Sequence, residues 1–147
     1  MKGAQNISEF ESVLRDAGFR ATPRRIKLLS ILAGEGKPMS INGILGAMGK
    51  RIDQATVYRA LEDLAYKGVV SRVDLRHGHA HFEFVPTSKH HHHLVCTSCG
   101  TLEDMDCPVA EIKKAPASSK KFKQVRDHSA EFFSLCNSCD SRLQTQA

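Results

Sequence analysis

Four of the five cysteines fall in two closely spaced pairs that together could bind one metal ion. The pairs are Cys96-x-x-Cys99 and Cys136-x-x-Cys139, and every cysteine follows residue 95. Two such turns can direct four thiolates at one zinc ion and close its tetrahedral coordination. An odd cysteine count argues against a disulfide framework. We therefore predict a structural zinc site rather than two independent redox or buried pairs, with Cys107 left over as an ordinary thiol.

Seven of the eight histidines lie between residues 77 and 93, and four of them, His90 to His93, are consecutive. If this run is extended, alternate side chains point to opposite faces. His90 and His92 would then serve one metal ion, and His91 and His93 another. Imidazole combined with carboxylate suits Zn, Fe, Mn, Ni or Co. The pattern favours metal binding over a merely polar, solvated strand.

A second group of potential ligands precedes this run. His77, His79 and His81 alternate along the chain, and His79 and His81 share one face of a predicted strand that Glu83 continues. Each of them alone is more often an ordinary surface residue. Together they are predicted donors to a site between the two halves of the chain.

The first half of the chain has the periodicity of a helical domain. Apolar residues at helical spacing predict helices over residues 9–17, 23–33, 41–48 and 54–67. Thr22, Ser40 and Asp53 are the predicted N-caps of the last three. After the fourth helix the period changes to that of two strands, residues 69–75 and 79–84, joined by a turn. Several helices followed by a basic hairpin predict a winged helix-turn-helix.

The second half is shorter and has more strand-like segments. Its pattern predicts strands over residues 93–96, 101–103 and 131–136 and a helix over residues 108–115. Residues 85–90 are predicted to be a linker. We therefore predict an α+β protein with a winged-helix domain over residues 1–84 and a small α/β domain, containing the zinc site, over residues 91–147.

The net charge of +5 is distributed unevenly along the chain. Residues 1–85 carry 13 Lys and Arg against 9 Asp and Glu, whereas the rest carries 8 against 7. A basic first half fits a polyanionic partner. The sequence has neither an apolar run of about 20 residues nor a signal peptide, so we expect a cytoplasmic protein that does not enter membranes.

Three segments and the end of the chain resemble one known family. They are residues 14–25 (LRDAGFRATPRR), 53–61 (DQATVYRAL) and 90–100 (HHHHLVCTSCG), followed by His128, Glu131-Phe132-Phe133 and the last cysteine pair. Over residues 13–139 the chain resembles the ferric uptake regulator family. Any one of these motifs alone would be weak, but their combination is highly specific.

The resemblance implies a DNA-binding transcriptional repressor rather than an enzyme, with a second domain that forms a homodimer. Its partner would be a palindromic double-stranded DNA operator, and its targets would be genes of metal homeostasis. Besides structural zinc it would bind a regulatory ion, with iron favoured and zinc or manganese as the other candidates. Zinc-uptake regulation and peroxide sensing are the alternative functions within the family.

The resemblance also implies roles for individual residues. The predicted DNA contacts are Arg20, Arg24, Gln54, Thr56, Tyr58 and Arg59. The structural zinc ligands would be Cys96, Cys99, Cys136 and Cys139. One metal site of the dimerisation domain would use His90, His92, Glu111 and His128. A hinge sensor site would use Glu83, His91 and His93 with His79 and His81 as added donors, and Asp104 as an auxiliary carboxylate.

Two interpretations outside this family are also considered. His81-x-Glu83 followed by Cys96-x-x-Cys99 weakly resembles the metal motif of zinc deaminases. However, Val95 stands where that motif has proline, and the second cysteine pair would have no role. The other interpretation is a zinc-ribbon DNA-binding protein that does not sense metal, whose affinity for DNA would not change on removal of a labile ion.

Overall fold

Amphipathic periodicity in the first half produces four helices in the part of the chain that the computed structural model describes, residues 6–49, 52–85, 90–126 and 128–144. The helices are α1 (Ile7–Asp16), α2 (Pro23–Glu35), α3 (Ile41–Met48) and α4 (Gln54–Tyr66). The side chains of Thr22, Ser40 and Asp53 each accept a hydrogen bond from the backbone N–H three residues later. The predicted caps are therefore confirmed, and they fix where α2, α3 and α4 begin.

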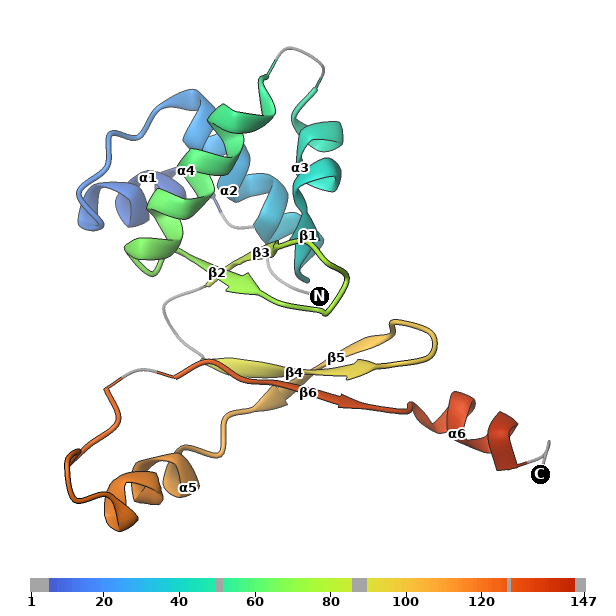
Figure 1. Ribbon diagram of the computed structural model, residues 1–147. Helices are drawn as coiled ribbons and strands as arrows, with labels where there is room; N and C mark the ends of the chain where they lie inside the picture. The colour runs from blue at the N-terminus through green and yellow to red at the C-terminus, as the bar shows by residue number, and fades with distance from the viewer. Residues whose placement is uncertain (1–5, 50–51, 86–89, 127, 145–147) are drawn as a thin grey trace. The chain divides into compact units, whose positions relative to one another are not determined.

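The chain divides into two units, Met1–Ser88 and Lys89–Ala147, whose elements are labelled in Figure 1. The predicted linker over residues 85–90 includes this boundary, but its residues 86–89 lie outside the described residues. Across the described ranges, every helix is too short or too polar to span a membrane.

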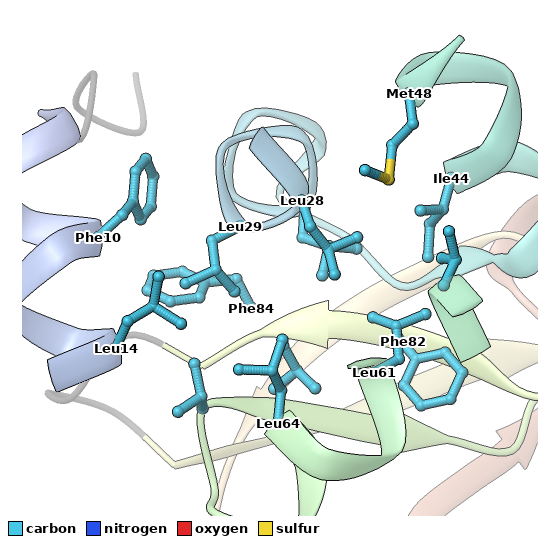
Figure 2. Close-up of a cluster of buried hydrophobic side chains, with 14 residues drawn as sticks. Phe10, Leu14, Leu28, Leu29, Ile44, Met48, Leu61, Leu64, Phe82 and Phe84 are labelled. Atoms are coloured by element: carbon cyan, nitrogen blue, oxygen red, sulfur yellow. The ribbon is translucent and has the colours of Figure 1, made fainter. Parts of the chain in front are cut away.

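The apolar faces of the four helices meet a small antiparallel sheet to form the core of the first unit. This sheet has the order β1 (Met39–Ser40), β3 (His81–Phe84), β2 (Val70–Val73). Phe10, Leu29, Leu61 and Phe82 are at most 2% exposed and belong to one cluster. Figure 2 shows side chains from α1, α2, α4 and β3 directed at one another in this cluster. Helices therefore pack on the β2–β3 hairpin, as a winged helix requires.

A second three-stranded sheet organises the other unit. Its order is β5 (Leu102–Asp106), β4 (His91–Cys96), β6 (Glu131–Ser134), with β4 antiparallel to β5 and parallel to β6. The helical segments of this unit are α5 (Val109–Lys114), the 3-10 helix η1 (Ala115–Ser118) and α6 (Asn137–Gln144). The strand β4 begins at His91, earlier than predicted, so most of the histidine run is extended.

The sequence does not predict α6, because its residues are polar and lack an apolar stripe. This helix begins within the second cysteine pair. The backbone N–H groups of Cys139 and Asp140 donate to the carbonyl of Cys136 at 2.9 and 3.0 Å. The turn that directs the two thiols thus also initiates the helix.

Candidate metal centres and nucleic-acid interface

The paired cysteines meet at one end of the second sheet. Cys96 is the last residue of β4, and Cys136 and Cys139 follow β6, which runs parallel to β4. The sulfur atoms of all four predicted ligands lie within 4.8 Å of one another, and those of Cys99 and Cys136 are 3.7 Å apart. In the part of the chain that the structure describes, this group consists of four thiols with no other donor type, which fits a closed tetrahedral zinc site.

Hydrogen bonds from backbone N–H groups lower the pKa values of Cys96 and Cys136, whereas neighbouring thiols raise the pKa of Cys136. The backbone N–H of Cys136, followed by those of Cys99 and Ser98, lowers the pKa of Cys96 to about 6. At Cys136 the N–H of Cys139 favours the thiolate, but the adjacent Cys139 and Cys99 thiols outweigh it and raise the pKa to about 11. Four thiolates at this spacing repel one another, and a bound dication would remove that repulsion.

Three histidines and one cysteine form a second group of converging donors in this unit. The Nε2 of His128 lies 2.8 Å from the Nε2 of His90 and 3.2 Å from that of His92. The Sγ of Cys107 lies 3.1 Å from the same nitrogen of His128. The Nδ1 of His92 is 2.9 Å from the carbonyl oxygen of Ala130, so Nδ1 carries the proton and Nε2 is left as a metal donor.

Glu111, which the sequence predicts as a ligand of this site, is not part of the group. It is exposed on α5, whereas Cys107 directly follows β5 and reaches His128. The ligand role predicted for Glu111 therefore has no support from this geometry. Asp106, the last residue of β5, is the register partner of His91, and Cys107 directly follows it. This position beside the histidine run is the sequence signal that could have identified Cys107 as a ligand.

His91 and His93 form a separate pair on β4. Their rings are 5.0 Å apart, and His93 is only 3% exposed. Asp104 is the partner of His93 in the β4–β5 register, and its carboxylate lies 3.9 Å from the Nε2 of His93. The predicted auxiliary carboxylate is thus next to the predicted sensor pair. Glu83, the predicted ligand from the first unit, is buried on β3.

His79 and His81, the other predicted sensor ligands, pack with His77 on the hairpin of the first unit. The ring of His81 lies 4.7 Å from that of His79 and 5.4 Å from that of His77. Burial, followed by repulsion from His79 and His77, lowers the pKa of His81. His77 follows the same alternation in the sequence, and in the structure one of its nitrogens lies within 4.8 Å of a donor nitrogen of each of the other two.

All six predicted DNA-contacting side chains are exposed: Arg20, Arg24, Gln54, Thr56, Tyr58 and Arg59. Arg24 and Arg59, together with Arg25, line one groove between α2 and α4. The guanidinium of Arg25 lies 4.9 Å from the centre of the Phe19 ring and donates to the carbonyl of Arg20 at 3.2 Å. A groove with three arginines is suited to bind phosphate groups.

The first turn of α4 is held in place by its cap and by packing. The Asp53 carboxylate accepts hydrogen bonds from the backbone N–H and the hydroxyl of Thr56 at 3.0 and 3.1 Å. The ring of Tyr58 packs edge-on against Phe82, with 6.3 Å between ring centres, and Tyr58 stays 38% exposed. Tyr58 is therefore both anchored and accessible, as a residue that reads base edges must be.

The model of the ferric uptake regulator family matches residues 16–133. The chain belongs to the ferric uptake regulator family. The ferric uptake regulation protein of Legionella pneumophila is 36% identical to it over 131 residues, which are 86% of this chain and 95% of that protein. The crystal structure of the Vibrio cholerae ferric uptake regulator is 32% identical with a TM-score of 0.64, and the match covers 86% of this chain and 98% of that one.

A further ferric uptake regulator, from Pseudomonas aeruginosa, has been solved with manganese. It is 29% identical with a TM-score of 0.68, and the match covers 87% of this chain and 98% of that one. Proteins of the ferric uptake regulator family are metal-responsive regulators of transcription, not enzymes. The predicted family, fold class and type of function are confirmed, and the deaminase interpretation is wrong.

Proposed function

We propose that this chain represses genes of metal homeostasis by binding a palindromic DNA operator as a cytoplasmic homodimer, with iron as the regulatory ion. The observation that carries the proposal is the combination of two features in one chain. The first unit has an arginine-lined groove beside the exposed beginning of α4, and the second has separate groups of metal donors. Zinc-uptake regulation and peroxide sensing are the alternatives, with zinc or manganese as the other ions.

An exposed apolar pair on the second sheet supports the homodimer. Leu94 and Phe132 are partners across β4 and β6, and they are 36% and 40% exposed. Large apolar side chains that lie side by side on a surface favour burial against a second protein surface. A second copy of the chain supplies the same pair in a two-fold symmetric contact.

The proposed switch is a hinge site with donors from both units. His91 and His93 of the second unit, with Glu83 of the first, would hold the regulatory ion. The coordination bonds of that ion would then link the two units. Because these donors belong to different units, coordination restricts the angle between the units. In a dimer this angle sets the distance between the two copies of α4, and a palindromic operator requires one particular distance.

A softer donor set than the sequence predicts is proposed for the site around His128. We assign Cys107 to it in place of Glu111, together with His90 and His92. The 3.1 Å separation of Cys107 Sγ and His128 Nε2 supports this assignment. Imidazole and thiolate donors favour Zn(II) or Co(II), whereas carboxylates favour Mn(II) and Mg(II).

Replacing Cys107 by Ser is expected to remove the sulfur-to-cobalt charge-transfer absorption of this site. Protein with zinc already bound by the paired cysteines is titrated with Co(II) and followed by near-ultraviolet and visible absorption. Wild type and Glu111→Gln, the matched control on α5, should both develop the band. If wild type binds Co(II) without developing this band, and Glu111→Gln weakens that binding, the predicted carboxylate ligand is restored in place of Cys107.

Tyr58→Ala is expected to weaken operator binding by about 1–3 kcal/mol and to relax the preference among base sequences. The reason is that its anchored, exposed ring would contact base edges. Tyr66→Ala is the matched control, because Tyr66 is 88% exposed at the other end of α4 and should not contribute. Fluorescence anisotropy with a duplex selected from a random library, and with its scrambled version, provides the measurement.

The groove makes a different contribution in the same assay. Arg24→Ala should weaken binding to every duplex and reduce the slope of log affinity against log salt by about 1, because one phosphate contact is lost.

If Tyr58→Ala keeps both its affinity and its selectivity, α4 is not the helix that reads the operator.

A further inference from the structure

Three histidines on the β2–β3 hairpin have no role in the proposed switch. His77 and His79 lie in the connection between the strands, and His81 is the first residue of β3. Gly78, between His77 and His79, has a φ of 76°, a backbone conformation that residues with a side chain rarely adopt. This conformation lets the chain turn between the two histidines. The backbone N–H of Arg76 donates to the carboxylate of Asp74 at 2.8 Å and fixes the entry to the turn.

The turn brings the three rings into mutual contact. The centres of the His77 and His79 rings are 6.1 Å apart, and both rings are near that of His81, at 5.4 and 4.7 Å. One nitrogen from each ring lies within 4.8 Å of the other two. Imidazolium groups at this spacing would repel one another, whereas neutral imidazoles directed at one point can share a cation.

The state of individual nitrogens points to a ligand. The Nδ1 of His79 is 3.0 Å from the carbonyl oxygen of His77, so it carries the proton and Nε2 is available as a donor. His81 is 7% exposed, and its buried Nδ1 has no hydrogen-bond partner among the residues that the structure describes. Leaving a buried polar atom unpaired destabilises a fold. Packing of the rings alone does not satisfy this nitrogen, whereas a bond from it to a metal ion would.

We propose that His77, His79 and His81 bind one late first-row divalent cation, with Zn(II) as the reference ion. Among the described residues the group consists of three imidazoles with no carboxylate, which disfavours Mg(II) and Ca(II) because these ions require oxygen donors. Three protein ligands also leave one position of a tetrahedral ion open to solvent. This site belongs to the first unit alone, so it is separate from the hinge site and from the two groups in the second unit.

The position of the cluster gives it a consequence for the nucleic-acid interface. His81 precedes Phe82, against which Tyr58 of α4 packs. A bound ion would add two positive charges to this hairpin while its three ligands stay neutral. The added charge would strengthen attraction to phosphate groups, and this consequence rests on the proposed DNA binding.

The test is a zinc count on the full-length dimer, which needs no DNA. His77→Gln/His79→Gln changes two exposed residues, keeps the buried His81, and is expected to bind one zinc ion fewer per chain than wild type. Arg72→Gln, an exposed change on β2, should bind as many ions as wild type. His91→Gln/His93→Gln removes hinge ligands only, so the group of His77, His79 and His81 should still bind zinc in that variant.

Nuclear magnetic resonance locates the ion. One equivalent of Zn(II) is added to protein whose other sites are filled. In wild type the imidazole nitrogen signals of His79 and His81 should shift. In His77→Gln/His79→Gln the signals of His81, the ring that remains, should not shift. An unchanged zinc count in that double variant would overturn the proposal. So would imidazole signals of the hairpin that do not respond to near-stoichiometric zinc in wild type.

Discussion

Replacing Cys136 by Ser is expected to remove one zinc ion per chain and to unfold most of the second unit. Among the described residues, the buried hydrophobic side chains of this unit are Val95, Cys96 and Cys139. The first unit instead has a core built from four helices and a sheet. Structural zinc contributes about 10–16 kcal/mol in small zinc domains at neutral pH, comparable with the whole stability of an ordinary domain.

Three measurements follow the loss of the zinc site. After a chelator removes labile metal, elemental analysis gives the zinc content, sedimentation gives the oligomeric state and circular dichroism gives the helix content. Cys136→Ser should be free of zinc and monomeric, with the helices of the first unit retained. Cys107→Ser makes the same chemical change in the same unit and should keep both zinc and dimer. A dimeric Cys136→Ser protein with its full zinc content would refute the closed site.

Features that depend on local chemistry can be predicted from this sequence. The caps at Thr22, Ser40 and Asp53 need only a side-chain oxygen and the N–H three residues later. Strand alternation alone predicts that His91 and His93 point to the opposite face of the strand from His90 and His92. The convergence of the paired cysteines follows from their spacing and from the demand of zinc for four ligands.

Features that depend on contacts between distant segments cannot be predicted in this way. His90 and His128 are 38 residues apart, and only the family resemblance predicts that they meet. The contact of Cys107 with His128, 21 residues away, is predicted neither by spacing nor by the resemblance. Cys107 and Glu111 are close in the sequence, so spacing does not decide between them, and the end of β5 selects Cys107.

Replacing His91 and His93 together by Ala is expected to abolish the activation of operator binding by metal, while the zinc-bound dimer persists. These residues are the proposed ligands from the second unit at the hinge, so losing them removes the crosslink between units. His90→Ala/His92→Ala, on the same strand, is the matched control. This control variant should lose only part of the activation, because an ion bound by His90 and His92 has all its ligands in the second unit and does not link the two units.

The activation itself is measured as operator affinity with and without the labile ion. Dimers with structural zinc, stripped of other metal, are titrated with labelled operator in the absence of oxygen, before and after addition of Fe(II), Mn(II) or Zn(II). For wild type we predict that Fe(II) raises the affinity about 5–150-fold, the usual range of allosteric coupling, and that a chelator reverses the rise. The His91/His93 double variant should show no rise. Equal wild-type affinity with and without every ion would contradict metal-dependent repression and would indicate a zinc-ribbon DNA-binding protein that does not sense metal.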